Sequence, residues 1–211
     1  MRLLRQVVLV SLLSVPAWST TLYSNGAVNG ATGGLDIDQP DGREVTDSFV
    51  ISATSTVTQV SNLGLWTNSA SGDSPLELSW VISTLPDGGG TVQGSASGEA
   101  FSSIVTFGTS GAFTVFSVSF AIPSVTLTPG TYYLELFNAL SNRNGFVGWD
   151  ENSGTSTADS NTYPTLGTPI TEASESFEID GTSAVPEPAS VATLGAGLGF
   201  LAWMSRRRKR A

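Results

Sequence analysis

The amino-acid sequence predicts an all-β fold, an antiparallel β-sandwich of jelly-roll-like type, between an N-terminal signal peptide and a single C-terminal hydrophobic helix. Three observations support this prediction. Apolar and polar residues alternate through the middle of the chain, turn sequences separate the alternating runs, and a charge-free apolar segment lies near each end. The 211 residues therefore divide into a signal peptide (1–19), a β-sandwich domain (20–183) and a C-terminal segment (184–211).

The N-terminal segment has the three parts of a secretory signal peptide. Arg2 and Arg5 supply positive charge, residues 7–15 form an almost unbroken apolar run, and the small residues Ala17 and Ser19 predict cleavage after position 19. The apolar run is too short to span a bilayer as a permanent helix. We therefore expect an exported protein that passes through the Sec translocon and is cleaved by signal peptidase.

The middle of the chain has the period-two alternation of half-buried β-strands. It is clearest in residues 45–51, 76–82, 116–122 and 132–137. In the first of these runs Asp47 falls in phase with Val45 and Phe49, which places a carboxylate on the apolar face. Turn sequences such as Pro40-Asp41-Gly42 and Asn144-Gly145 separate the runs. About eight to ten strands at this spacing predict a two-sheet sandwich.

Composition excludes several kinds of chemistry. The chain has no cysteine and no histidine, so disulfides, thiol nucleophiles, Cys/His zinc sites and the Ser-His-Asp triad are all excluded. Residues 20–183 contain 17 of the 18 acidic residues but only Arg43 and Arg143 of the nine basic ones. So acidic a domain should repel nucleic acid and anionic membrane surfaces. We therefore expect a non-enzymatic domain with no nucleic-acid partner.

The C-terminal segment carries the most specific pattern. A short proline motif comes first, Val185-Pro186-Glu187-Pro188, and residues 189–205 follow it without any charge. A basic cluster then completes the pattern: Arg206, Arg207, Arg208, Lys209 and Arg210. The apolar run is about as long as the shortest membrane-spanning helices. Because basic clusters stay in the cytoplasm, the cluster predicts that the β-domain lies outside the membrane.

This arrangement resembles the PEP-CTERM sorting signal of exported bacterial proteins. The resemblance covers about 27 residues, from Val185 to the end of the chain. It implies recognition by an exosortase, a membrane-embedded transpeptidase that cleaves near Pro186-Glu187-Pro188 and discards the helix and basic tail. It also implies a bacterium that makes exopolysaccharide. The expected location is the cell envelope, cell surface or extracellular matrix, with a transient or retained inner-membrane anchor.

An acidic cluster near the start of the domain is a candidate calcium site. Five carboxylates fall within twelve residues, and three of them are the proposed ligands: Asp36, Asp38 and Asp41. Carboxylate oxygens at such density can bind Ca²⁺. The segment departs from the EF-hand loop, because Pro40 occupies the fifth position and the glycine comes one residue late. We therefore expect a solvated acidic loop without metal, and so no cofactor, and a calcium site of another type between strands is the alternative.

Trp149 and Asp150 are the candidate ligand-binding pair. Trp149 follows a glycine-containing turn beside acidic residues, so it could be an exposed platform for stacking a sugar. A buried tryptophan at the end of the sandwich is the default alternative. Three functions therefore remain open: a non-enzymatic surface or matrix protein, a carbohydrate-binding module associated with exopolysaccharide and assisted by calcium, and an enzyme with a buried acid.

Overall fold

The computed structural model describes residues 19–69, 72–163, 168 and 170–183, and these form two antiparallel β-sheets. The eight-stranded sheet contains β1 (Thr20–Ser24), β2 (Gly34–Asp36), β4 (Ser55–Asn68), β7 (Ser103–Ser110), β8 (Phe113–Leu127), β10 (Val147–Asn152), β13 (Ser174–Glu175) and β14 (Glu178–Ser183). The six-stranded sheet contains β3 (Arg43–Ile51), β5 (Pro75–Ser83), β6 (Val92–Ala100), β9 (Gly130–Ser141), β11 (Ala158–Thr162) and β12 (Ile170–Glu172). No α-helix occurs among the described residues. The prediction of an all-β, antiparallel fold is confirmed.

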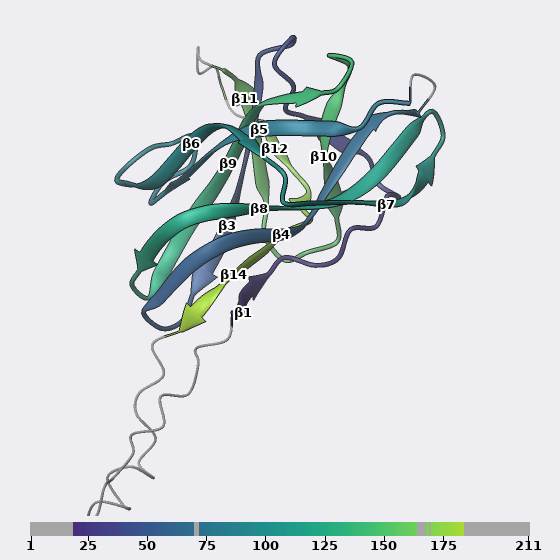
Figure 1. The fold of residues 1–211 in the computed structure, drawn as a ribbon. Helices are drawn as coiled ribbons and strands as arrows, with labels where there is room; N and C mark the ends of the chain where they lie inside the picture. The colour runs from purple at the N-terminus through teal and green to yellow at the C-terminus, as the bar shows by residue number, and fades with distance from the viewer. Residues whose placement is uncertain (1–18, 70–71, 164–167, 169, 184–211) are drawn as a thin grey trace, which may run out of the picture.

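The strand order joins segments that are distant in sequence. In the first sheet β1, β14 and β4 are neighbours, and β4 also pairs with β8 and β10. The second sheet has the order β12-β11-β3-β9-β5-β6. Pairing of β1 with β14 places Thr20 opposite Gly181, so both ends of the described domain lie on one edge of the molecule (Figure 1).

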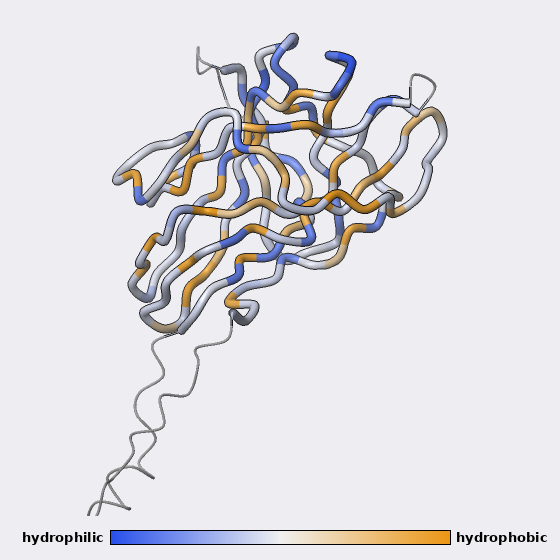
Figure 2. Tube along the Cα trace, in the orientation of Figure 1, coloured by the Kyte–Doolittle hydropathy of each residue, from blue (hydrophilic) through white to orange (hydrophobic). Residues whose placement is uncertain are grey.

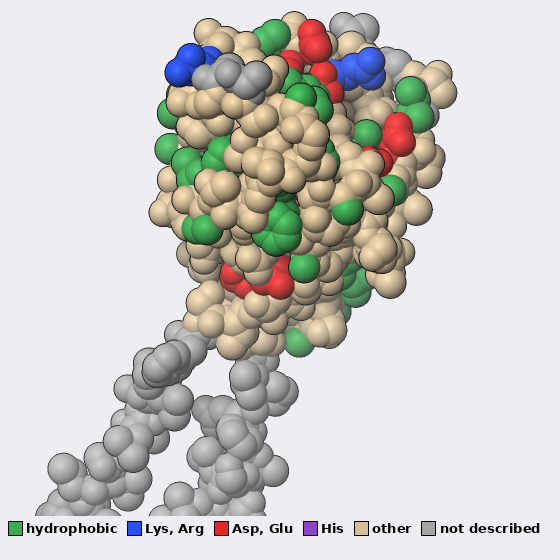
Figure 3. Space-filling view, turned by 90° about the vertical axis from the view of Figure 1, so that its right-hand side faces the viewer, with side chains coloured by type: hydrophobic (Ala, Val, Ile, Leu, Met, Phe, Trp, Pro, Cys, Tyr) green, Lys and Arg blue, Asp and Glu red, His purple; other side chains and the backbone are tan. Residues whose placement is uncertain are grey.

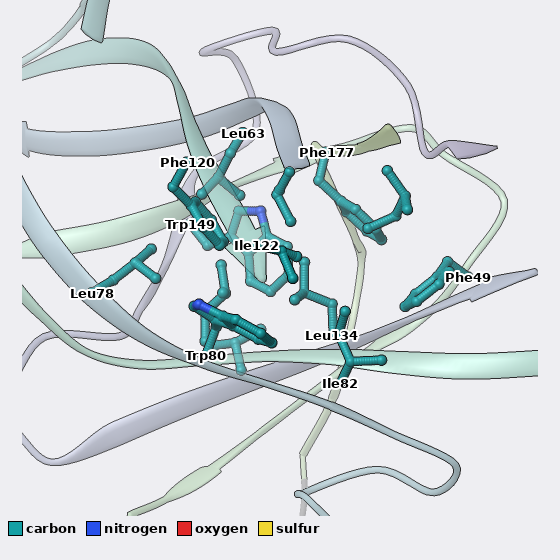
Figure 4. Packing of buried hydrophobic residues seen from close by; sticks show 14 of the residues in the cluster. Phe49, Leu63, Leu78, Trp80, Ile82, Phe120, Ile122, Leu134, Trp149 and Phe177 are labelled. Carbon is teal, nitrogen blue, oxygen red and sulfur yellow. The ribbon is translucent and has the colours of Figure 1, made fainter. Parts of the chain in front are cut away.

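The core between the sheets consists of the side chains that alternation predicts. Trp80, Phe120, Leu134 and Phe49 are at most 1 % exposed, and they pack with Trp149 and Phe177 (Figure 4). Aromatic contacts link the two sheets, with 6.4 Å between the ring centroids of Trp80 on β5 and Phe120 on β8. Hydrophilic segments gather in the loops at the end opposite the chain termini (Figure 2). Apolar burial of this extent is the main favourable contribution to folding.

Two sequence expectations are wrong in detail. Alternation through residues 76–82 places Leu76 in phase with Leu78, but Leu76 is 50 % exposed, because β5 has register irregularities against β9 between Pro75 and Ser79 that change which face each residue occupies. The Ser/Thr/Gly-rich sequence of residues 152–168 predicts a loop, yet β11 lies within them. Although this strand is rich in polar residues, it forms because its backbone pairs with the edge of β3.

Candidate functional site

The expected sorting residues lie outside the described residues. This applies to the motif (185–188), the apolar run (189–205), the basic cluster (206–210) and the signal peptide through position 18. The structure does show where the domain ends before that segment. Its last strand, β14, is held between β1 and β4, and its final residue Ser183 pairs with Ser55.

Trp149 is buried and cannot act as a surface platform for a sugar. Its side chain is 0 % exposed, and its indole Nε1 donates a hydrogen bond to the Ser176 carbonyl at 3.0 Å. On β10, Trp149 and Val147 lie two residues apart and therefore share the inner face of the strand, so the Trp149 ring faces the second sheet. The prediction of an exposed platform at Trp149 is therefore wrong, and the default alternative of a buried tryptophan is confirmed.

Asp150 is an internal anchor rather than a free ligand group. It is also 0 % exposed, and its carboxylate accepts hydrogen bonds from the backbone nitrogens of Asn29 (2.9 Å) and Gly30 (3.1 Å). Trp66 donates a third from Nε1 at 2.6 Å. Gly64 allows this close approach, because a Cβ at that position would lie 2.4 Å from the Cβ of Asp150. The three donors satisfy the buried charge and fix the segment that precedes β2.

The structure brings the predicted calcium ligands together. The carboxylate oxygens of Asp36, Asp38 and Asp41 lie within 4.8 Å of one another. A tight turn holds them, since the Asp38 nitrogen donates to Asp36 Oδ1 at 3.0 Å and the Asp41 nitrogen donates to Asp38 Oδ1 at 2.9 Å. Burial and the charges of Asp38 and Asp41 together raise the pKa of Asp36 to about 6. Hard oxygen ligands in this arrangement fit Ca²⁺ better than softer metals.

A cavity of about 300 Å³ opens beside this acidic turn. It shares Asp36 with the turn and is also lined by Arg43, Glu172, Ser160, Leu35 and Ile170. The lining combines two carboxylates and a guanidinium with two apolar side chains. Figure 3 shows acidic and basic side chains close together at the end of the molecule away from the chain termini. Such a surface offers several hydrogen-bonding groups to a polar ligand.

The sequence analysis missed a second acidic site inside the sandwich. Asp47 and Glu175 are both 0 % exposed. Asp47 accepts hydrogen bonds from Asn25 Nδ2 (2.9 Å) and from the Glu175 backbone nitrogen (2.8 Å), and burial raises its pKa to about 6. Burial and, after it, the charge of Asp47 raise the pKa of Glu175 well above its usual value. The phase of Asp47 with Val45 and Phe49 was a signal for this site, whereas Glu175 had none.

A third acidic group lies on the outer face of the six-stranded sheet. Glu44 on β3 and Glu135 on β9 are 1 % and 4 % exposed, and their carboxyl groups share a hydrogen bond. Asp87 from the β5–β6 turn lies beside them and is held by Thr46 Oγ1 at 3.2 Å. Burial, the Glu44 charge and its hydrogen bond raise the pKa of Glu135 to about 8. Outward-facing acids normally stay in water, so alternation did not indicate this pair.

Comparison with known families gives a single finding for the C-terminal segment. Residues 184–209 match the family described as the PEP-CTERM protein-sorting motif. The suspected PEP-CTERM signal is therefore present, and it indicates exosortase-dependent sorting of an exported protein with association to the cell envelope. No curated protein matches the chain. Within the described residues we find no helix with the length and apolar character needed to cross a membrane.

Proposed function

We propose that this chain is a cell-surface or extracellular-matrix protein of a bacterium, with a non-enzymatic β-domain that is delivered and processed through its C-terminal signal. The match of residues 184–209 to the sorting motif carries the proposal. In this account the Sec translocon exports the chain, signal peptidase cleaves after Ser19, and an exosortase-type transpeptidase cleaves near Pro186-Glu187-Pro188. Arg206 to Arg210 act as the cytoplasmic stop that positions the motif.

The shape of the domain supports removal of both ends. β1 begins at Thr20, one residue after the expected signal-peptidase site, and β14 ends at Ser183, two residues before Val185. Both cleavages would therefore leave every described strand intact. Because β1 and β14 are paired, the two processed ends stay together on one edge, and the rest of the surface is free to face the matrix (Figure 1).

The strand orders support the finer prediction of a jelly roll. The set β1-β14-β4-β8 lies in one sheet and the set β3-β9-β5-β6 in the other. When these two groups of four strands are followed along the chain, most of the connections lead from one sheet to the other, as in two interleaved Greek keys. Jelly rolls are common among surface and carbohydrate-binding modules, but the fold alone does not define an activity.

Replacement of the motif in the native host tests the sorting proposal. With Pro186, Glu187 and Pro188 all changed to alanine, the exosortase should lose its recognition element, so the protein should accumulate in the membrane fraction with Trp203 and the basic tail attached. The matched control is Ser183→Ala, which lies just before the motif and should be processed as the wild-type protein is. Normal removal of the tail from the triple variant would contradict the proposal.

A second candidate function is calcium-assisted binding of carbohydrate, for example of exopolysaccharide. The observation that favours it is the sharing of Asp36 between the acidic turn and the 300 Å³ cavity. A bound Ca²⁺ would complete the polar lining of the cavity at that point. A glycan screen with and without Ca²⁺, repeated on Asp38→Asn, tests it. Binding that requires Ca²⁺ and is lost in the variant would support this function, and absence of any calcium-dependent glycan binding would exclude it.

A further inference from the structure

Four oxygen atoms surround the side-chain nitrogen of Asn25 inside the sandwich. Nδ2 lies 2.9 Å from Asp47 Oδ2, 2.6 Å from Ser156 Oγ, 2.9 Å from Ser174 Oγ and 2.8 Å from the Glu175 carbonyl oxygen. An amide nitrogen carries only two hydrogens, so it can satisfy only two of these four acceptors well. The oxygens come from β3, from β13 and from the segment between β10 and β11. The fold therefore places more hydrogen-bond acceptors around this nitrogen than its two hydrogens can satisfy.

The side chain of Glu175 adds an independent observation at the same place. It is 0 % exposed, and neither of its carboxylate oxygens has a hydrogen-bond partner among the described residues. Among the charged groups, Asp47 acts most strongly on this carboxylate, and Asp47 Oδ2 also accepts a hydrogen bond from the Glu175 backbone N–H. A buried carboxylate without donors is among the most costly groups that a protein can contain.

Among the described residues, no cation faces this carboxylate. Residues 20–183 contain no lysine and only two arginines. Arg143 lies 3.9 Å from Asp73, and Arg43 lines the separate cavity with Asp36. The other charges that act on Glu175 all belong to acids: Asp47, Glu151, Asp150 and Glu172. The described residues therefore supply no positive charge that would neutralise Glu175.

We propose that Ca²⁺ binds at this position, with the carboxylates of Asp47 and Glu175 as its charged ligands. Ser156 Oγ, Ser174 Oγ and the Glu175 carbonyl supply neutral oxygens. Calcium takes six to eight oxygen ligands of these kinds and tolerates irregular geometry. Two carboxylates also balance the charge of the ion.

Asn25 can join the ligand set by turning its amide. Its Oδ1 accepts a hydrogen bond from the Tyr23 hydroxyl at 2.9 Å. A hydroxyl both donates and accepts, so the flipped amide can donate to Tyr23 instead while Oδ1 faces the ion. Calcium then coordinates Oδ1 of Asn25 together with the surrounding oxygens, and it ties the first strand region to β3 and β13. This site is separate from the acidic turn of Asp36, Asp38 and Asp41.

Calcium titration of the full chain, purified in mild detergent and stripped with EGTA, tests the proposal. The readout is the Tm, followed by tryptophan fluorescence as CaCl₂ is added. Calcium at about a hundredfold excess over its Kd should raise the Tm of the wild-type protein by about 5–10 °C. Glu175→Gln keeps the size of the side chain but removes the charge, so it should lose the increase. The matched control Asp38→Asn removes a carboxylate from the other candidate site and should keep it.

A direct measurement of metal binding tests the proposal even with a variant whose stability is too low for a clear Tm. Ser174→Ala removes one neutral ligand and no charge, and it should weaken binding of Tb³⁺, a luminescent substitute for calcium excited through tryptophan, by about tenfold. The proposal is overturned if calcium leaves the wild-type Tm unchanged, if Glu175→Gln keeps the full response, or if only Asp38→Asn abolishes it. None of these outcomes depends on whether the C-terminal tail is processed, so failure here and failure of the sorting proposal are distinguishable.

Discussion

Two buried carboxylates at one end of the sandwich have opposite environments. Asp150 on β10 and Glu175 on β13 are both fully buried, and the strands that carry them are paired. Asp150 accepts three hydrogen bonds from groups of the chain, whereas Glu175 accepts none from the described residues. The described residues supply hydrogen-bond donors to the first acid and none to the carboxylate of the second.

This difference distinguishes a buried carboxylate that stabilises the fold through its hydrogen bonds from one that lacks such partners and is suited to bind a ligand. A buried charge with a full set of donors rigidifies its surroundings, and Asp150 does so for Trp66 and the segment before β2. A buried charge without donors costs stability until a proton or a cation neutralises it. Burial alone therefore does not identify a site, but burial together with missing partners does.

Loss of the satisfied acid should have the largest effect. Asp150→Ala leaves the Trp66 indole N–H and two backbone N–H groups buried without an acceptor, so we expect a loss of about 3–5 kcal/mol in the free energy of unfolding. Urea unfolding of the full chain measures it, and the isosteric Asp150→Asn should lose less because one side-chain oxygen remains. A loss below about 1 kcal/mol would show that these hydrogen bonds do not anchor the segment.

An intermediate effect on stability should come from Glu135, a buried acid whose partner is another acid, Glu44. The pKa of Glu135 is raised to about 8 by burial and by Glu44, with Asp87 also facing it. Because the pKa of Glu135 is raised in the folded state, the folded protein still holds this proton at pH values at which the unfolded chain has already released it. Stability should therefore be greatest below about pH 4.5 as far as this group is concerned, and should fall as the pH rises toward 8, by up to about 1.4 kcal/mol per pH unit.

The pH dependence of the midpoint of urea unfolding checks this sign. Glu135→Gln should flatten the slope between pH 5 and 8, while Glu99→Gln on β6, an acid outside the group, should leave it unchanged. A wild-type stability that rises across this interval would contradict the assignment of a shared proton to Glu44 and Glu135.

The smallest effect should come from Glu175 when calcium is absent. Because burial raises the pKa of Glu175 well above its usual value, the calcium-free carboxyl group favours its uncharged, protonated form. Glu175→Gln then replaces one uncharged group by another of similar volume, so the calcium-free protein should change by less than about 1 kcal/mol. Urea unfolding in EGTA measures this value beside that of Asp150→Asn. If Glu175→Gln were the more damaging of the two, the contrast between the two acids would be wrong.

Local patterns predict the apolar part of this fold but not its polar interior. Alternation identified Trp80, Phe120 and Leu134 as core residues, and it placed Asp47 on the same face as Phe49. It did not show that Asp150 is satisfied, because the donors Asn29 and Gly30 are 121 and 120 residues away along the chain. Glu175 lies in a short polar segment without periodicity, and its burial depends on pairing with β10. Long-range pairing of this kind is set by the whole fold rather than by neighbours in the sequence.

The intact mass of the protein recovered from the surface or medium of its own host tests the central claim most directly. Peptide mapping of both ends should accompany it. The account predicts a chain that begins near Thr20 and ends near Pro186, with the apolar run and the basic cluster removed. A recovered chain that still carries Trp203 and Arg206 to Arg210 would contradict sorting by an exosortase, and would leave a β-domain held by its own C-terminal segment.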